Sequence, residues 1–383
     1  MTSKPKIFVV YSRSGCCYWR TWIPCEEMRK QGLAEFRYLD SRLMTPETLK
    51  ENLKWCDIVH IRGLLGTDAL STMRQYQNLG LKVVTDYDDN HFEVSPFNPA
   101  YREFGLEDVQ VRNPSNGDIQ FLWKDGENGF DIKRNQVKYH AFKALLQEAD
   151  AVTTPTLYLK NKFEEVSQRF DNIHVLPNAI DFDQWKPFPN IREKYKERFR
   201  FGWAVSNSHR EDFIFIKPAL NKFLLDHPDA TFVCLGDAGL DLKQGLPAAQ
   251  IEWHPFSDLW EGHYQLRMAL LGLDVGICPL ANTEFNRCKS PLKYEEYTAF
   301  GWPTIAQKME PYISHIVNGE TGLLAETTED WVRCLESLYS NPSLRAKLAF
   351  NARFAVKEMF DLKNVAQEWA KVYSDLLSGA LLK

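Results

Sequence analysis

The sequence predicts an α/β protein made of two Rossmann-like, doubly wound domains. Three observations support this fold class. Short apolar segments alternate with helix-length segments through most of the chain, which is the pattern of parallel strands covered by helices on both faces of a sheet. The alternation stops once, in the proline-rich stretch 178–190, and then restarts. The 383 residues suffice for two units that each bury a core of their own.

The elements of the first domain follow from apolar runs that end at Gly, Asn, Asp or Ser. We expect strands at 6–12, 36–39, 58–61, 83–85, 151–154 and 174–176. We expect helices at 21–31, 46–55, 68–78, 131–148 and 157–169. The segment 95–129 is rich in Pro, Asn, Asp and Gly and is longer than a connection requires, so we expect an irregular insertion there.

The second domain repeats the alternation and then becomes helical. We expect strands at 199–204, 230–235, 251–253, 275–278 and 304–306. We expect helices at 213–225, 259–271, 291–299, 330–339, 342–359 and 362–377. The predicted domains are therefore 1–182 and 183–360, followed by a helical C-terminal tail at 361–383.

The composition excludes several classes of protein. The 46 Lys and Arg residues face 51 Asp and Glu residues, and the net charge of −5 disfavours a duplex-DNA binder without excluding a local basic cleft. No apolar run approaches the roughly 18 residues of a membrane-spanning helix, and the N-terminal apolar run lacks a signal-peptide cleavage pattern. The eight cysteines form no CxxC motif, so we expect free thiols in a cytoplasmic protein; the pair Cys16–Cys17 has no assigned role.

Doubly wound sheets bind ligands beyond the carboxyl ends of their strands, so the expected site is a central cleft that both domains face. Ser290 and Pro291 form a typical helix start in the stretch that follows one of these strands. The cations Lys289 and Lys293 flank that start, where each costs roughly 0.3–1 kcal/mol against the helix dipole. A bound anion would explain both lysines.

Glu296 lies one turn beyond Lys293 on the same helix face, about 4.5 Å deeper along the axis. That distance suits a ribose next to a bound phosphate, because a carboxylate accepts hydrogen bonds from both hydroxyls of a diol. The alternative is a solvated helix face that carries an i,i+3 Lys–Glu pair and no ligand.

Four motifs give the chain a likeness to a known family. They are KSxLKYxEYxxxGxP at 289–303, GxxGLL at 319–324, LPNAID at 176–181 and ADAVTTPT at 149–156. Together they resemble the GT-B glycosyltransferases, particularly those similar to retaining family 4. The resemblance implies two Rossmann-like domains, a last helix that packs back across them, and a nucleotide-diphosphate sugar as donor, with UDP as the expected carrier.

The resemblance also implies roles for particular residues. Glu296 matches the second glutamate of the E-x7-E motif, which holds the donor ribose in such enzymes. The first glutamate would stand where this chain has Cys288, so the contact to the donor sugar is open; Glu284 and Asn286 lie nearby at a different spacing. The donor-binding residues expected in this way are Glu296, Ser290, Lys293, Ser206, Ser208, Asn286 and Gly236.

Part of that set belongs to the loop after the first strand of the second domain. In similar enzymes this loop presents a basic pair to the diphosphate, and here Ser206, Ser208 and His209 occupy it. The alternative is that Ser208 caps the next helix, with Glu211 completing a capping box. Gly236 follows the next strand, where either a ligand-facing turn or a plain turn is expected.

The candidate acceptor-side residues follow strands of the first domain. They are Gly15, Arg20, Arg62, Asp86 and Asp89, and Asp88 lies between the last two in the sequence. Carboxylates this close repel one another unless they are paired, and Arg20 or Arg62 is an available partner. We interpret the cluster as binding acceptor hydroxyls or supporting charge at the reacting centre; the alternative is a solvated loop with an Asx turn. Asp86-x-Asp88 also matches the metal motif of GT-A enzymes, but that class leaves the second domain without a role.

We therefore expect a nucleotide-sugar-dependent glycosyltransferase that retains anomeric configuration, with Lys289, His209 and Asp88 as candidate catalytic residues. We expect neither a metal nor another cofactor, because no HExxH, GxxxxGK or GxGxxG motif is present. The acceptor is open between a surface glycan, a protein side chain, a metabolite and a hydroxylated phage-type DNA base, the last disfavoured by the net charge. Two alternatives are a non-catalytic nucleotide-sugar-binding partner subunit, suggested by Cys288, and a GT-B sugar-nucleotide epimerase.

Overall fold

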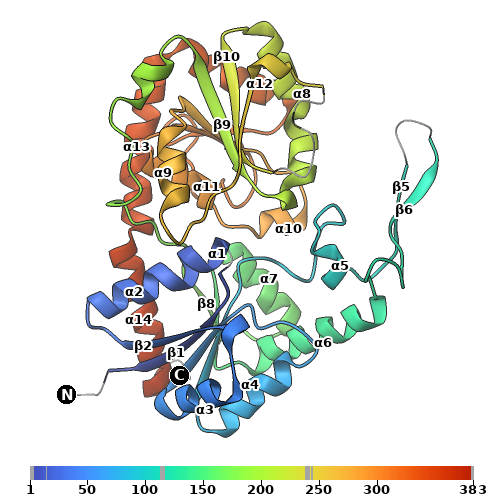
Figure 1. Cartoon of the computed structure of the whole chain (residues 1–383), viewed down its shortest axis with the longest axis vertical. Coiled ribbons are helices and arrows are strands. Elements are labelled where there is room, and N and C mark those ends of the chain that lie inside the picture. The colour runs from blue at the N-terminus through green and yellow to red at the C-terminus, as the bar shows by residue number, and fades with distance from the viewer. Residues whose placement is uncertain (1–3, 14, 113–116, 238–241, 243–244, 381–383) are drawn as a thin grey trace. The chain divides into compact units, whose positions relative to one another are not determined.

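The computed structural model describes residues 4–13, 15–112, 117–237, 242 and 245–380 (Figure 1). The chain forms two compact units. Unit 1 consists of Met1–Ala179, Cys288–Ser290 and Leu362–Lys383, and unit 2 consists of Ile180–Arg287 and Pro291–Asp361. The first segment of unit 1 therefore ends at Ala179. The unit also includes the C-terminal helix and three residues from the second half of the sequence.

Unit 1 is built on a parallel six-stranded sheet in the order β2-β1-β3-β4-β7-β8. Its strands are β1 (Lys6–Tyr11), β2 (Glu35–Asp40), β3 (Ile58–Arg62), β4 (Lys82–Asp86), β7 (Ala151–Thr154) and β8 (Ile173–Val175). Ile7, Phe8 and Val9 of β1 are all fully buried, as expected for a parallel strand covered on both faces. Because β1 pairs with β2 on one side and with β3 on the other, the winding of the chain reverses beside β1.

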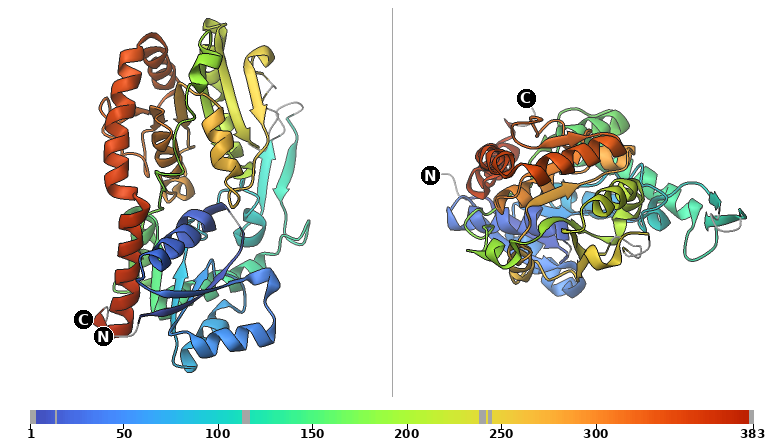
Figure 2. Two further views of the ribbon diagram at one scale, coloured as in Figure 1. Left: turned by 60° about the vertical axis from the view of Figure 1, so that its left-hand side comes forward. Right: turned by 90° about the horizontal axis from the view of Figure 1, so that it is seen from above.

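Helices cover both faces of this sheet. One face carries α3 (Pro46–Trp55), α4 (Ala69–Asn78), α6 (Ile132–Glu148) and α7 (Leu157–Ser167), and the other carries α2 (Ile23–Lys30) and α14 (Leu362–Ser378), which pack side by side (Figure 2). The α14 residues Trp369 and Tyr373 contact His60 of β3, whose Nδ1 lies 2.6 Å from the Tyr373 hydroxyl. The short α1 (Gly15–Cys17) and a π-helical turn, Tyr18–Trp22, precede α2, where one helix from residue 21 was expected.

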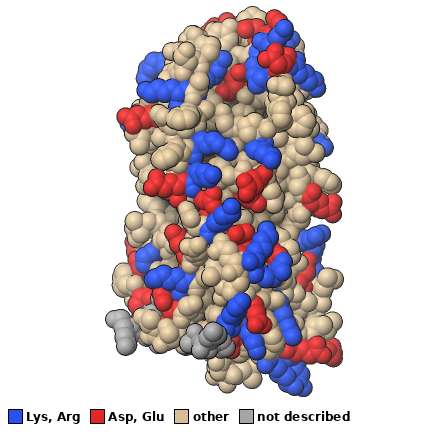
Figure 3. Space-filling model, turned by 90° about the vertical axis from the view of Figure 1, so that its left-hand side faces the viewer, with Lys and Arg blue, Asp and Glu red and all other residues tan. Residues whose placement is uncertain are grey.

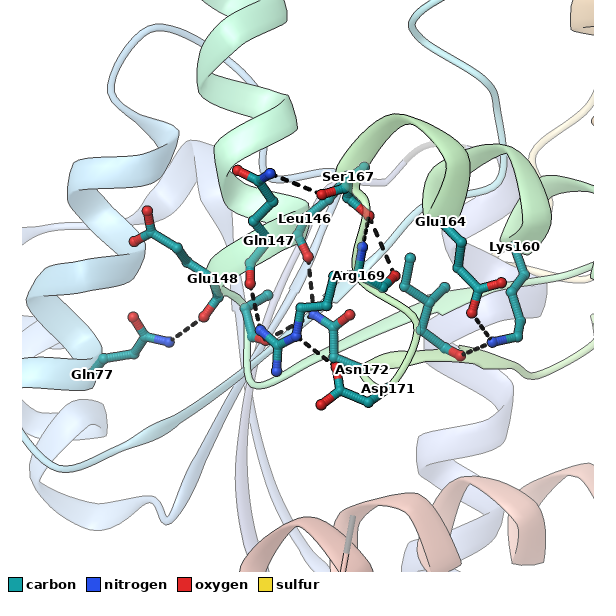
Figure 4. A network of polar contacts seen from close by, with 12 residues as sticks. Gln77, Leu146, Gln147, Glu148, Lys160, Glu164, Ser167, Arg169, Asp171 and Asn172 are labelled. Atoms are coloured by element: carbon teal, nitrogen blue, oxygen red, sulfur yellow. Dashed lines mark hydrogen bonds and ion pairs between the residues drawn. The ribbon is translucent and has the colours of Figure 1, made fainter. Parts of the chain in front are cut away.

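The carboxyl end of α6 illustrates how a buried helix terminus is satisfied, since its last carbonyl groups have no partner within the helix. Figure 4 shows Asn172 donating to the carbonyl of Leu146 at 2.9 Å and Arg169 donating to the carbonyl of Gln147 at 2.5 Å. Gln147 in turn donates to the carbonyl of Ser167 at the end of α7. Side chains after α7 thus tie two helices to the start of β8.

Part of the segment 95–129, which was predicted as an irregular insertion, is regular structure. Residues Tyr101–Phe104 form α5, and β5 (Val109–Arg112) pairs with β6 (Ile119–Trp123) as an antiparallel hairpin whose connection includes residues 113–116, outside the described residues. The Trp123 indole donates to the carbonyl of Pro96 at 2.7 Å and its ring packs near Tyr101 and Phe130. The many turn-forming residues hid a hairpin whose strands have only four and five residues.

Unit 2 repeats the architecture with a second parallel six-stranded sheet, in the order β11-β10-β9-β12-β13-β14. Its strands are β9 (Phe199–Val205), β10 (Ala230–Gly236), β11 (Ile251–His254), β12 (Val275–Cys278), β13 (Thr304–Gln307) and β14 (Leu323–Ala325). Its helices are α8 (Arg210–Asp226), α9 (His263–Leu270), α10 (Glu284–Arg287), α11 (Leu292–Ala299), α12 (Thr328–Ser340) and α13 (Pro342–Phe360). The sequence did not predict β14 or α10, both of which are very short.

The core of unit 2 joins both ends of its sequence. Alternate residues of β9 and β10, including Phe201 and Phe232, pack with Trp331 and Leu335 of α12. The proline-rich stretch after Ala179 is anchored to this unit, because Ile180 donates its backbone N–H to Phe360 at 2.9 Å. Trp185 is fully buried against Tyr264 and Phe300. The expected linker is therefore packed structure from Ile180 onward.

Two expectations from the sequence concern membrane-spanning helices and the charge of the molecular surface. No helix among the described residues is both long and apolar enough to cross a membrane. On the face drawn in Figure 3, acidic and basic side chains are interspersed, as the near balance of 46 basic and 51 acidic residues suggests.

Candidate functional site

The most suitable ligand-binding position in unit 2 is the carboxyl edge of its sheet between β9 and β12. These two strands are neighbours, and the chain winds away from them toward opposite sides of the sheet. Ligands of doubly wound sheets bind at such a switch point, because the loops that follow the two strands diverge and leave room. The two loops are residues 206–209, between β9 and α8, and residues 279–287, which follow β12 and include α10.

The loop after β9 presents two hydroxyl groups at the start of a long helix. Ser206 Oγ and Ser208 Oγ lie 2.8 Å apart, and Asn207–His209 form a single helical turn before α8. His209 occupies the N-cap position of α8, and its side chain does not cap the helix. The proposed capping box of Ser208 with Glu211 is therefore wrong. The start of a 17-residue helix next to two hydroxyls is typical of an anion site.

The two switch-point loops are joined by Asp212, a residue that the sequence analysis did not single out. Its carboxylate accepts hydrogen bonds from His209 Nδ1 at 2.6 Å, from the backbone N–H of Ala281 at 2.6 Å and from Asn286 Nδ2 at 2.8 Å. Asn286 also donates to the carbonyl of Ala281. Asn286 was predicted to bind the sugar donor, but its side-chain NH2 group donates both of these hydrogen bonds within the protein.

Helix α11 places Lys293 and Glu296 as the helical spacing predicts. Lys293 Nζ donates to Glu296 Oε2 at 2.9 Å, and the hydroxyl of Tyr264, from α9, donates to the same oxygen at 3.3 Å. Glu296 is fully buried, and burial raises the pKa of its carboxyl despite the nearby Lys293. The i,i+3 Lys–Glu pair of the alternative is therefore present, but its carboxylate is buried and not solvated.

The second oxygen of Glu296 is the notable feature of this cluster. Among the described residues, no donor lies within hydrogen-bonding distance of the buried Oε1. A buried acceptor without a donor is costly, by roughly 1–3 kcal/mol, so such atoms are rare unless a ligand or water supplies the donor. The hydroxyl of a ribose has the required chemistry.

Gly236 ends β10 in a conformation that only glycine adopts readily. Its φ is +106°, and a Cβ atom there would lie 1.9 Å from the carbonyl oxygen of Val205. Its own carbonyl accepts from the indole of Trp253 at 2.5 Å. The glycine therefore allows β9 and β10 to end close together at the switch-point edge.

The predicted start of α11 differs from the structure. Pro291 is the N-cap of α11, and Ser290 instead accepts a hydrogen bond from Asn178 Nδ2 at 2.8 Å, within unit 1. Cys288 is fully buried in the hydrophobic core of unit 1, and Lys289 lies 3.6 Å from Asp89. The basic stretch is thus divided, since Cys288–Ser290 belong to unit 1, whereas Lys293 and Glu296 belong to unit 2.

The carboxyl edge of unit 1 holds a buried network of charges. Arg20 and Asp86 are both fully buried; Arg20 Nε donates to Asp86 at 3.0 Å, and Thr153 Oγ1 donates to the same carboxylate at 2.6 Å. Arg62 pairs with Asp88 at 2.6 Å. Both predicted partners are therefore used, and burial leaves Arg20 and Asp86 no surface with which to contact an acceptor.

These pairings decide the ionisation of the carboxyls. Burial alone would raise the pKa of Asp88. The charge of Arg62 and a hydrogen bond from Cys16 nevertheless hold this pKa well below its usual range. Arg20 lowers the pKa of Asp86 against the same effect of burial. The alternative of a solvated loop is wrong for these two residues, although Asn90 does form an Asx turn with the backbone of Phe92.

Of the remaining acceptor-side candidates, Gly15 begins α1 and is exposed, and Asp89 is partly exposed beside Lys289. Cys16 and Cys17 are both free thiols. A cavity of about 510 Å³ beside α9 was not predicted from the sequence. It is lined by His254, Ser257, Asp258, His263, Leu266, Arg267, Leu270 and Leu271. Its position beyond the carboxyl end of β11 is the sequence signal that was available.

Among the described residues, no cluster of His, Cys, Asp and Glu side chains has an arrangement that could hold a metal ion.

Comparison with known proteins gives the fold a name. No protein-family model matches the sequence. Over 203 residues the chain is 22% identical to TuaH of Bacillus subtilis (strain 168), which is described as a teichuronic acid biosynthesis glycosyltransferase. The match spans 49% of each chain, so this protein covers about half the length of that curated relative.

Solved structures match over nearly the whole chain. Anabaena HepE, in complex with UDP and glucose, superposes with a TM-score of 0.65 at 14% identity, over 97% of this chain and 99% of that one. Sucrose-phosphate synthase of Thermosynechococcus elongatus superposes with a TM-score of 0.66 at 14% identity, over 98% and 100% of the two chains. The protein has the GT-B fold. The predicted fold class, two parallel sheets of six strands each with a helical C-terminal region, is confirmed.

Both sheets of this fold are doubly wound, and ligands of such sheets bind at the carboxyl edge. A glycosyltransferase from Rickettsia africae has the same fold, with a TM-score of 0.63 at 17% identity over 98% of this chain.

Proposed function

We propose that this GT-B protein is a glycosyltransferase that moves a sugar from a UDP-sugar to a hydroxyl acceptor. The observation that carries the proposal is the buried Glu296 carboxylate, whose Oε1 has no donor among the described residues while Oε2 is held by Lys293 and Tyr264. The structures of HepE with UDP and with UDP-glucose support UDP as the nucleotide. The match to TuaH supports sugar transfer as the reaction.

The donor would bind along the switch-point edge of unit 2. Glu296 accepts hydrogen bonds from the ribose hydroxyls, with Lys293 and Tyr264 fixing its orientation. The hydroxyls of Ser206 and Ser208, the imidazole of His209 and the N-terminus of α8 bind the diphosphate. Groups that are stronger donors toward the departing diphosphate than toward the intact donor accelerate the transfer.

The resemblance to family 4 supports Lys289 and Ser290 as ligands of the diphosphate. Lys289 neutralises the negative charge that develops on the leaving group, exchanging its 3.6 Å contact with Asp89 for phosphate oxygens. The resemblance to retaining family 4 supports retention of configuration, in which a phosphate oxygen of the donor takes the proton of the acceptor hydroxyl. No side chain then has to act as a strong base.

The acceptor would be recognised at the carboxyl edge of unit 1. Asp88 is held ionised by Arg62, and Asp88, Asp89 and the backbone of Gly15 provide acceptors and donors for sugar hydroxyls. Arg20 and Asp86 act through this frame and not by contact. The description of TuaH favours a glycan acceptor over a protein, a metabolite or a DNA base. Eight free cysteines favour a reducing cytoplasmic environment, and we expect turnover without added metal.

A second candidate function is a nucleotide-sugar-binding subunit without transferase activity. The observation that favours it is the burial of Cys288 in the core of unit 1 at the position where similar enzymes have a glutamate for the donor sugar. Such a protein would bind UDP-sugar and neither hydrolyse nor transfer it.

The test has two stages. First, binding of UDP, GDP, ADP and their sugar conjugates is measured by calorimetry; the proposal requires UDP to bind to wild type and to bind Glu296→Ala more weakly. Second, the UDP-sugar that binds is incubated with candidate glycan acceptors, with and without EDTA, and products are identified by mass spectrometry. Lys289→Ala should slow turnover while UDP still binds. Binding with no turnover on any acceptor and no slow hydrolysis would support the non-catalytic subunit, and conversion without acceptor would indicate an epimerase.

A further inference from the structure

The side chain of Asp212 contacts both switch-point loops of unit 2. It lies in the first turn of α8, where the helix dipole favours an acidic residue, yet its carboxylate does not cap that helix. Oδ2 accepts from His209 Nδ1, in the loop after β9, and Oδ1 accepts from the backbone N–H of Ala281 and from Asn286 Nδ2, in the loop after β12.

The burial of Asp212 makes these bonds matter. Its side chain is 2% exposed, and an ionised carboxylate at that depth is costly unless several donors replace its water. The three donors that do so come from positions 3, 69 and 74 residues away in the sequence. Separating the two loops would leave the charge unpaired, so the carboxylate holds the loops in one arrangement.

The same carboxylate selects one tautomer of His209. An ionised carboxylate only accepts hydrogen bonds, so Nδ1 of His209 must carry the proton of the 2.6 Å bond. The ring is also fixed from the side by Trp203, whose indole lies edge-on at 5.7 Å between centroids.

We infer that Asp212 is a positioning residue of the donor site, which sets the tautomer of His209 and locks the loops after β9 and β12 in the arrangement that binds the donor diphosphate. The inference rests on the proposed function and extends it to a residue that contacts no substrate. An Asn at this position cannot keep the arrangement, because its NH2 group must face either His209 Nδ1 or the Ala281 N–H. Facing the ring, it would move the proton of His209 to Nε2.

The test compares wild type, Asp212→Asn and Asp274→Asn. Asp274 is a matched control, since it is also a nearly buried aspartate that accepts from a backbone N–H, that of Arg200 at 2.8 Å, and from an arginine, but at the opposite edge of the same sheet. We expect Asp212→Asn to weaken UDP binding and lower kcat/KM by about 10- to 100-fold. We expect Asp274→Asn to leave UDP affinity and kcat/KM unchanged at temperatures where the variant is folded.

A spectroscopic measurement separates positioning from simple stability. Protein labelled with nitrogen-15 in its histidine rings is examined by NMR, with His209→Gln used to assign the His209 signals. Wild type should show a protonated Nδ1 at neutral pH, and Asp212→Asn should show the proton at Nε2. Equal UDP affinity and kcat/KM in wild type and Asp212→Asn, or an unprotonated Nδ1 in wild type, would overturn the inference. The wild-type spectrum decides the matter if Asp212→Asn does not fold. Failure of wild type to bind UDP would count against the proposed function and not against this role of the carboxylate.

Discussion

At the carboxyl edge of unit 1, the buried carboxylate of Asp86 is satisfied by Arg20 and Thr153, whereas at the carboxyl edge of unit 2 the buried carboxylate of Glu296 has one oxygen with no donor among the described residues. The pKa of Asp86 is lowered by its arginine partner, and the pKa of Glu296 is raised by burial. Ionised Asp86 therefore stabilises the folded chain at neutral pH, whereas ionised Glu296 lowers its stability. A costly acid at a ligand-binding edge is typical of a site whose missing donor belongs to the ligand.

The largest expected effect concerns the carboxyl edge of unit 1, where Asp86 is paired with Arg20. Asp86→Ala leaves Arg20 as an uncompensated buried charge, so we expect the free energy of unfolding to fall by about 3–5 kcal/mol. Urea denaturation followed by circular dichroism measures it. The control is Lys371→Ala, which removes an exposed ion pair with Asp375 on α14 and should change the same quantity by less than about 0.5 kcal/mol. A loss for Asp86→Ala as small as that of the control would remove the contrast between the edges.

The equivalent change at the other edge should separate binding from stability. Glu296→Gln removes the desolvation cost of a buried charge, so we expect the thermal midpoint of the ligand-free protein to stay level or rise. UDP affinity should fall by about 10- to 100-fold, because the amide accepts fewer hydrogen bonds from the ribose. Calorimetry and thermal unfolding on the same samples measure the two effects. A variant that loses stability and keeps its UDP affinity would show that Glu296 is a structural acid.

The opposite pKa shifts predict a pH order. Lowering the pH protonates Glu296 first, because its folded-state pKa is raised, and Asp86 and Asp88 last, because theirs are lowered. The stability that Asp86 and Asp88 contribute is present above the unfolded pKa of about 3.9 and is lost only as the pH falls through their lower folded values. UDP affinity of wild type should therefore weaken in mild acid more than that of Glu296→Gln. Parallel pH profiles in the two proteins would contradict this order.

The smallest expected effect concerns the hydroxyls before α8. Ser208→Ala removes one neutral donor to the diphosphate, worth about 0.5–1.5 kcal/mol, so UDP affinity should fall about two- to tenfold. The thermal midpoint should not change, since Ser208 does not cap the helix. Ser343→Ala, at an exposed position of α13, is the control for serine removal as such.

How much the sequence predicted depended on the distance between interacting residues along the chain. Strands such as Ala151–Thr154 and Val275–Cys278 were predicted exactly as the structure has them, because a buried parallel strand is a continuous apolar run. The proximity of Lys293 and Glu296 follows from helical spacing alone. The prediction that Ser290 caps the helix was wrong, because its partner, Asn178, is 112 residues away in the sequence. Asp212 was missed for the same reason, since Ala281 and Asn286 lie far along the chain and no local pattern marks a carboxylate that joins two loops.

Unit 1 draws on three separated stretches of the chain, of which Cys288–Ser290 is only a triplet set inside the sequence of unit 2. A chimaera made by a single cut after Ala179 would strand that triplet and α14 with the wrong half. Exchanging donor specificity between proteins of this architecture therefore requires a graft with four junctions, in which the recipient keeps its own thiol, lysine and serine at 288–290 together with its own last helix.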